Sequence, residues 1–335
     1  MPDLKLYMAP IRGVTDHVFR NAFAEHFGGF DLAVAPFIPS KRDNSVKKKY
    51  VRDLWPENNP AMPVIAQILS NAATDFVILA NYIYDLGYQT VNWNLGCPYP
   101  MVANKKRGSG LLPHTDRIHE FLEYAIPRLK GDLSIKLRLG WQTHEDIFRL
   151  IPVLNQFPVK ELIIHPRTGI QRYHGKPDLD ALDQCLGQVH HPVVYNGDIR
   201  TLGDFRRLSL RFGNLDRWMI GRGAIADPFL PMTIKAGKND VRDRAYLMKR
   251  FHDTLVDRYM VILDGPGHVL NKMKGLWQYF SLFFPDCGTA LKKIKKSRTP
   301  EQYRERVEML FDEHVEYADG MNKEEQGSTG MNIKI

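Results

Sequence analysis

The feature that most limits the possible folds is a regular alternation of short apolar segments with longer amphipathic ones. Eight short segments rich in apolar and β-branched residues recur along the chain: 5–10, 30–37, 63–69, 90–95, 133–139, 161–165, 192–195 and 217–220. Several are nearly continuous apolar runs, as expected of parallel strands covered on both faces. Most of the segments between them have the three- and four-residue apolar spacing of helices, including 71–86, 116–129, 145–157 and 202–212. This alternation predicts an α/β fold of the (β/α)8 TIM-barrel type.

An open, doubly wound sheet is the alternative fold. It is less favoured because no GxGxxG motif follows the first apolar segment. Polar residues gather instead directly after the apolar segments, where strands would end. In a barrel the carboxyl ends of the strands meet at one face, where active sites form. The sequence therefore predicts an enzyme whose site lies at that face.

The alternation stops after residue 228, and segments 242–263, 268–284 and 299–317 have helical spacing. We predict a catalytic barrel domain at residues 1–240 and a helical domain at 241–320. The polar segment 321–335 is predicted to be a disordered tail.

The composition narrows the location and the partners. No apolar run approaches the roughly 18 residues of a membrane-spanning helix, and the N-terminus lacks the apolar core of a secretion signal, so we expect a cytoplasmic protein. The three cysteines lie far apart without a CxxC pair, which argues against a disulfide framework or a metal site. The net charge of +8 suggests a polyanionic partner.

Basic residues form three runs. Residues 41–52 hold six Lys or Arg and one Asp, and the other runs are Lys105, Lys106 and Arg107, and the four lysines of 292–296. Solvated surface loops are the usual meaning of one such run. Three runs together with the aromatic residues Trp277, Tyr279 and Phe280 favour binding of an RNA backbone.

Cys97 stands out among the cysteines because it lies between Gly96 and Pro98, on a tight loop after the fourth apolar segment. Cys185 and Cys287 lie on helix-like segments and fit the ordinary role of small buried side chains. A thiol with a pKa near 8.5 is mostly protonated at neutral pH and can donate a proton. The alternative, a nucleophilic thiolate, lacks a histidine in a suitable context.

Ordered motifs along nearly the whole chain resemble those of the tRNA-dihydrouridine synthase family, flavoenzymes that reduce a uridine of tRNA. They are MAPIRGVTDHVFR at 8–20, VIAQIL at 64–69, NLGCPYPMV at 94–102, RGSGLL at 107–112, SIKLRLGW at 134–141, IIHPRT at 163–168, YNGDI at 195–199 and MIGRGA at 219–224. The segment KMKGLWQYF at 272–280 is similar to the RNA-binding domain of that family.

The resemblance implies a reaction that saturates the C5–C6 bond of uracil. No side chain donates hydride, so a cofactor must do so. In the family this cofactor is FMN, reduced by NADPH. Hydride would then reach C6 while Cys97 protonates C5, and Asn94 would hydrogen-bond the base or the flavin. A uridine inside folded tRNA must be extruded to reach a barrel mouth.

The resemblance also assigns residues to the cofactor. The phosphate would lie at Asn196, Gly197, Asp198, Gly221 and Arg222, after the last two strands. An unpaired Lys136 within a covered strand would be costly, and a bound anion would remove that cost. His165 is placed with the cofactor as well, although a lone histidine could equally belong to the core.

The remaining assignments concern the rim of the site. Gln67 would face the pyrimidine edge of the flavin, and Pro10, Ile11 and Arg12 would line its floor or edge. The sequence leaves open whether the Arg12 side chain meets flavin, substrate or solvent. Contacts to RNA or uracil are expected from Arg138, Arg167 and Tyr173, and contacts to tRNA from Lys105, Lys106 and Arg107.

Two other functions remain in view. One is a barrel flavoenzyme that acts on a small molecule, and the other is a catalytically silent RNA-binding barrel. A monomer is the default expectation. The sequence does not say which tRNA uridine is modified, nor whether NADPH is preferred to NADH.

Overall fold

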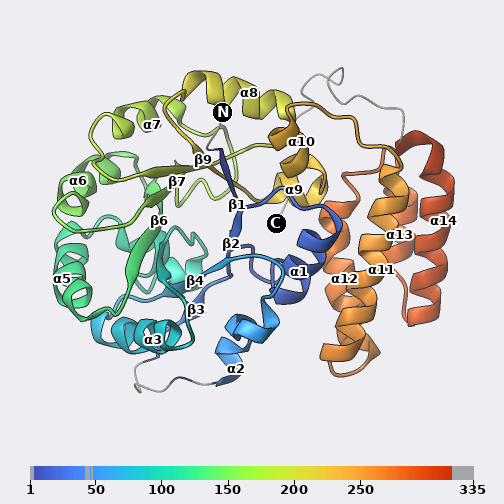
Figure 1. Ribbon diagram of the computed structural model, residues 1–335, viewed down its shortest axis with the longest axis horizontal. Helices are drawn as coiled ribbons and strands as arrows, with labels where there is room; N and C mark the ends of the chain where they lie inside the picture. Colours follow the sequence, from blue (N-terminus) through green and yellow to red (C-terminus); the bar gives the residue numbers. More distant parts are fainter. Residues whose placement is uncertain (1–3, 42–45, 47, 319–335) are drawn as a thin grey trace.

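The strands of the computed structural model, which describes residues 4–41, 46 and 48–318, close into a parallel barrel (Figure 1). The sheet has the order β2-β1-β9-β8-β7-β6-β5-β4-β3, and a further pairing of β2 with β4 closes it. The strands of the described chain are β1 (Lys5–Met8), β2 (Leu32–Val34), β3 (Ile38–Pro39), β4 (Val64–Leu69), β5 (Thr90–Leu95), β6 (Asp132–Gly140), β7 (Leu162–Thr168), β8 (Val193–Asn196) and β9 (Arg217–Ile220). The predicted TIM-barrel fold is confirmed.

Two strands differ in extent from the sequence prediction. The segment 30–37 was expected as one strand, but pairing is interrupted before β3, where Pro36 has no N–H to donate. Strand β7 was expected to end at His165 and instead continues through Thr168. His165 and Arg167 therefore lie two residues apart on one strand, on the same face of the sheet.

The helices that follow the strands cover the outside of the barrel (Figure 1). They are α1 (His17–His26), α2 (Lys48–Val51), α3 (Ala73–Asp85), α4 (Pro100–Ala103), α5 (Thr115–Ala125), α6 (Glu145–Leu154), α7 (Leu179–Leu186), α8 (Leu202–Arg211), α9 (Arg222–Ala226) and α10 (Leu230–Ala236). Short 3-10 turns lie at Arg52–Leu54, Pro56–Asn58, Gly108–Leu111 and Ile126–Arg128.

Side chains of the strands divide between two cores, as the two-residue period of a strand requires. The barrel interior holds a compact cluster of Tyr7, Ala9, Val34, Ile163, Val194 and Met219. The neighbouring strand residues, such as Leu6, Trp93 and Trp218, belong instead to the larger core between strands and helices. Because apolar side chains fill the lower barrel, space for a ligand remains only at the mouth.

The C-terminal helices are α11 (Arg244–Ile262), α12 (Pro266–Phe280), α13 (Gly288–Lys295) and α14 (Pro300–Ala318), and they lie together beside α1 (Figure 1). The predicted boundary near residue 240 falls between α10 and α11. The predicted disordered tail at 321–335 lies outside the described residues. Phe251 of α11 packs edge-on against Phe19 and Phe23 of α1. This apolar contact fixes the helical segment on the barrel.

The expectation that Trp277 and Phe280 face RNA is wrong. Both side chains are buried in the core between α11, α12 and α14, and the indole N–H of Trp277 donates to the hydroxyl of Tyr303 at 2.8 Å. Tyr279 is buried as well, but it lines the pocket at the barrel mouth. Within the described part of the chain, no helix is long and apolar enough to cross a membrane.

Candidate functional site

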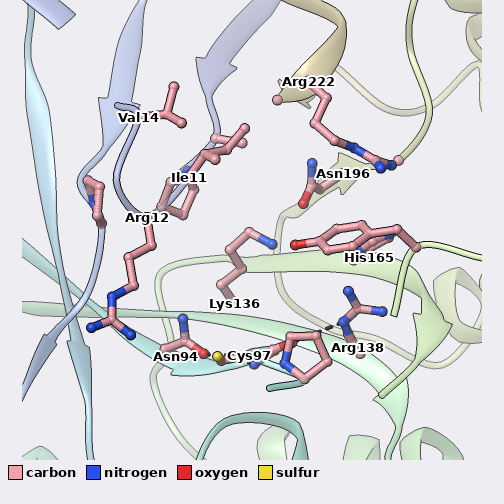
Figure 2. Close-up of a pocket in the computed structure, with 18 of the residues that line it drawn as sticks. Ile11, Arg12, Val14, Asn94, Cys97, Lys136, Arg138, His165, Asn196 and Arg222 are labelled. Carbon is pink, nitrogen blue, oxygen red and sulfur yellow. Dashed lines mark hydrogen bonds between the residues drawn. The ribbon is translucent and has the colours of Figure 1, made fainter. Parts of the chain in front are cut away.

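A pocket of about 220 Å³ opens at the carboxyl ends of the barrel strands (Figure 2). A single water needs only about 10–15 Å³ by the same measure, so the pocket suits a multi-ring ligand. The structure brings together in its lining most of the residues that the sequence singled out. They are Pro10, Ile11, Arg12, Gln67, Asn94, Cys97, Lys136, Arg138, His165, Tyr173, Asn196, Gly197, Asp198, Gly221 and Arg222.

The loop that carries Cys97 is held at both ends by hydrogen bonds. The side-chain oxygen of Asn94 accepts from the backbone N–H groups of Gly96 at 3.1 Å and Cys97 at 2.9 Å. The carbonyl of Cys97 accepts from the backbone N–H of Ser109 at 3.1 Å and from its hydroxyl at 3.0 Å. The loop thus has little freedom, and the position of the thiol is set by residues on two separate segments.

Gly108 explains why the RGSGLL motif accompanies the cysteine. Its φ of +55° lies in the left-handed region, and a Cβ there would lie 2.6 Å from the carbonyl oxygen of Cys97. Only glycine accepts both conditions without displacing the loop. The RGSGLL motif therefore supports the Cys97 loop. The motif could be seen in the sequence, but this structural role could not.

Asn94 and Gln67 belong to a chain of buried side chains at the pocket floor. The Asn94 amide donates to Gln67 at 2.7 Å, the Gln67 amide to Asn92 at 2.8 Å, and the Asn92 amide to Ser134 at 2.8 Å. The oxygen and one N–H of Asn94 form hydrogen bonds within the protein, and through the oxygen it holds the backbone of Cys97. Its contact with the base or the flavin stays a prediction.

The environment of the Cys97 thiol keeps it protonated. The residue is only 7% exposed. Burial raises the pKa of the thiol, and the backbone N–H of Tyr99 and the charges of Arg138, Arg12 and Lys136 only partly oppose this. A neutral thiol at the mouth of a pocket is suited to donating a proton.

Lys136 lies in the middle of β6, between the buried Ile135 and Leu137, and its ammonium group points into the centre of the pocket (Figure 2). It forms neither a hydrogen bond nor an ion pair with any residue that the structure describes. Burial, followed by the charge of Arg138, lowers the pKa of Lys136 to about 7, with Cys97 opposing. An unpaired, desolvated ammonium is a binding site for an anionic or electron-rich group.

His165 is held in one tautomer by Arg167. The guanidinium of Arg167 lies 3.1 Å from Nε2 of His165. A guanidinium only donates, so Nε2 accepts and the ring proton is on Nδ1. Burial and then the charges of Arg138 and Lys136 lower the pKa of His165 well below its ordinary value. His165 therefore offers the pocket a neutral N–H donor.

The predicted contact of Arg167 with RNA or uracil is wrong. Arg167 is 1% exposed and does not line the pocket. Its guanidinium donates to both oxygens of Asp198, at 3.1 and 2.6 Å, and to the carbonyl of Gly175 at 2.7 Å. It acts behind His165, as the residue that orients the ring.

Asp198 is neutralised by two arginines, which explains a carboxylate beside an expected phosphate site. Burial opposes its ionisation, but the hydrogen bonds and charge of Arg167, with the charge of Arg222, outweigh burial and lower the pKa of Asp198. Arg222 lies 3.3 Å from Asp198 and 4.4 Å from the ring centre of Tyr173. Arg138 also lies over that ring, at 5.4 Å.

Close packing within the protein explains two glycines near the last two strands. A Cβ on Gly197 would collide with the ring of Tyr195, and one on Gly223 with the carbonyl of Ile199. These glycines are therefore required by packing within the protein. Helix α9 begins at Gly221 without a side-chain cap, which leaves its first N–H groups available to an anion.

Other lining residues were missed from the sequence. Gln278 and Tyr279 of α12 reach the pocket, although their segment had been assigned to RNA binding. Phe37 and Tyr99 also line it, and Tyr99 is 41% exposed. Helix α12 contacts α9, so the helical segment forms part of the mouth.

The predicted tRNA contacts lie outside the pocket. Lys105 and Lys106 are exposed on the loop between α4 and the 3-10 turn at Gly108–Leu111. Arg107 donates to the Asn71 side chain at 3.1 Å. The lysines of 292–296 lie on and just after α13. Of the run at 41–52, residues 42–45 and 47 fall outside the described residues.

Comparison with known proteins identifies relatives over most of the chain. The family model described as dihydrouridine synthase matches residues 7–319. A probable tRNA-dihydrouridine synthase of Rhodobacter capsulatus is 28% identical over 80% of this chain and 82% of its own length. A tRNA-dihydrouridine(16) synthase of Vibrio vulnificus is 25% identical over 91% and 99%. Among solved structures, the old yellow enzyme homologue of Zymomonas mobilis shares the fold, with a TM-score of 0.52, 14% identity, and coverage of 72% of this chain and 91% of that one.

Proposed function

The chain belongs to the dihydrouridine synthase family of oxidoreductases, and we propose that it reduces the C5–C6 double bond of a uridine in tRNA. The observation that carries the proposal is a neutral thiol, Cys97, fixed at the mouth of a pocket that also contains the unpaired ammonium of Lys136. The first group can give up a proton and the second can hold an electron-rich ring. The reaction needs both.

The pocket fits a flavin, and FMN with NADPH as reductant is the form that the family resemblance implies. Lys136 and the Nδ1–H of His165 would hold the ring system, Gln67 would face its pyrimidine edge, and Pro10 and Ile11 would line its floor or edge. The uncapped start of α9, with Arg222 and Asn196 nearby, would take the phosphate. When bound in reduced form, the flavin supplies the hydride that C6 of uracil accepts.

Cys97 would donate the proton that C5 accepts. Its loop is fixed by Asn94 and Ser109, so the thiol is in place before the base arrives. After the transfer, the thiolate would be stabilised by the Tyr99 N–H and by the charges of Arg138, Arg12 and Lys136. The same groups that moderate the thiol pKa thus lower the energy of the product state.

The names of the relatives and the positive net charge of the chain support tRNA as the substrate. We propose that residues 1–240 carry catalysis and that residues 241–320 bind tRNA. Lys105, Lys106 and Arg107, beside the Cys97 loop, would contact its backbone. A uridine extruded from the tRNA would enter the mouth between this loop and α12.

A single-turnover experiment tests the proposal. Flavin-loaded protein is reduced without oxygen and mixed with unmodified tRNA. We expect reoxidation of the flavin together with dihydrouridine in the tRNA, whose position mapping then identifies. Reoxidation by a free pyrimidine but not by tRNA would replace the proposal with a small-molecule reductase. Failure to bind flavin would refute the cofactor assignment.

A further inference from the structure

Arg12 is an exposed cation at the pocket mouth for which the site described above supplies no binding partner. It follows β1 and lines the pocket. Its guanidinium forms neither a hydrogen bond nor an ion pair within the described residues. The guanidinium carbon lies 5.8 Å from the centre of the Phe37 ring. A charged group backed by an aromatic face and open to solvent is prepared to meet a partner from outside.

Arg12 also stands apart from the other cations of the pocket. Figure 2 shows its side chain across the pocket from Arg222 and His165, extending toward Asn94 and Cys97. Arg138 and Arg222 both lie over the ring of Tyr173, at 5.4 and 4.4 Å from its centre. Arg12 lies instead against the ring of Phe37. The mouth therefore has two positive regions.

The two regions fit two different anions. Lys136, Arg138 and Arg222 line the part of the pocket assigned to the flavin. The Arg12 region lies at the rim, beside the thiol that must meet the base. Uracil is neutral, but the nucleotide that carries it has a phosphate on either side, and these stay at the rim when the base enters. A planar guanidinium matches the oxygens of such a phosphate with two parallel hydrogen bonds.

We propose that Arg12 binds a backbone phosphate adjacent to the extruded uridine and so holds that nucleotide at the Cys97 side of the mouth. This inference rests on the proposed function, because it requires a polynucleotide substrate. It assigns to substrate a residue whose partner the sequence left open among flavin, substrate and solvent.

Steady-state kinetics on unmodified tRNA at several salt concentrations test the proposal. We expect R12A to raise the KM for tRNA roughly tenfold, as for loss of one charged hydrogen-bonded contact. The slope of log KM against log salt should fall by about one unit. R12K should keep most of the slope but only part of the affinity, since it keeps charge without the planar fork. R207A is the matched control: Arg207 is 73% exposed and pairs with Asp204 on α8, away from the mouth.

A second measurement locates the contact. Substrates carrying a neutral methylphosphonate next to the mapped uridine should lose affinity for wild type and none further for R12A. If R12A behaves as R207A does, Arg12 binds no phosphate. If R12A loses flavin while its salt slope matches wild type, Arg12 belongs to the cofactor. If wild-type protein does not act on tRNA at all, the proposed function has failed rather than this inference alone.

Discussion

The carbonyl oxygen of Cys97 accepts two hydrogen bonds from Ser109, one from its backbone N–H at 3.1 Å and one from its hydroxyl at 3.0 Å. Twelve residues separate the two along the chain. Both are buried, and Ser109 is not among the residues that line the pocket. The geometry of the thiol therefore depends on a residue outside the pocket lining.

Ser109→Ala removes the hydroxyl bond and leaves the backbone bond. We expect turnover to fall roughly three- to tenfold, because a loosened loop spends less time in the reactive geometry. The flavin content should stay unchanged. Single-turnover rates with bound flavin measure the effect. Ser209→Ala is the control, since Ser209 is also buried and donates to a backbone carbonyl, but on α8. Equal rates for the two variants would contradict the supporting role of Ser109.

Cys97→Ala removes the proposed acid. We expect it to bind flavin and accept electrons from NADPH as wild type does, yet to form dihydrouridine about 10²–10⁴-fold more slowly. The product in tRNA, measured after one turnover, gives the rate. Cys185→Ala, at a buried cysteine of α7, should retain activity. Near-wild-type turnover by Cys97→Ala would show that another group donates the proton.

The pH dependence of the chemical step should follow the Cys97 thiol. Burial raises its pKa, and the active form of an acid is the protonated one. Activity should therefore persist through the range in which an ordinary thiol ionises and fall only at higher pH. Single-turnover rates at saturating tRNA across pH 6–10 would report this limb, where about 8.5 is the ordinary thiol pKa. A rate that instead rises with pH through that value would point to a thiolate nucleophile.

Lys136→Met should stabilise the flavin-free protein while weakening flavin binding. The pKa of Lys136 is lowered to about 7 in the fold, against about 10.4 when unfolded, so folding opposes its charge. The destabilisation is complete below pH 7 and disappears as pH rises toward 10.4. We expect a gain on the order of 1–3 kcal/mol at pH 6 that shrinks by pH 9.

Denaturant unfolding of flavin-free protein at the two pH values measures that gain, and flavin titration measures the loss. Lys105→Met, at an exposed lysine outside the pocket, is the control. A pH-independent difference between wild type and Lys136→Met would show that the ammonium is not desolvated.

The barrel and much of its pocket could be predicted because strand period and strand ends are local properties. Apolar runs of strand length identify the strands, and the parallel barrel then brings their ends together without further information. Lys136 is an example: its position between Ile135 and Leu137 places it on the inner face of a covered strand. The structure leaves it unpaired there, as that argument required.

The predictions that were wrong or missing concern side chains whose partners lie far away in the sequence. The Arg167 side chain could not be assigned without knowing that Asp198, 31 residues later, would pair with it. Gln278 and Tyr279 join the mouth through contact of α12 with α9, which no local pattern encodes. Met273, Trp277 and Phe280 have core spacing along α12, and that signal could have corrected the assignment of Trp277 and Phe280 to RNA.

Helix α12 also determines how freely this protein could be recombined with its relatives. Lys272 on that helix donates to the carbonyl of Gly13 at 2.7 Å and to Asp16 at 2.6 Å, on the loop that begins with Arg12. Tyr259 of α11 donates to the same aspartate at 2.8 Å. A chimaera that exchanged only the C-terminal helices would set a foreign helix against a native loop. The unit of exchange is therefore split in sequence, and a working swap must carry residues 12–16 together with the helical domain.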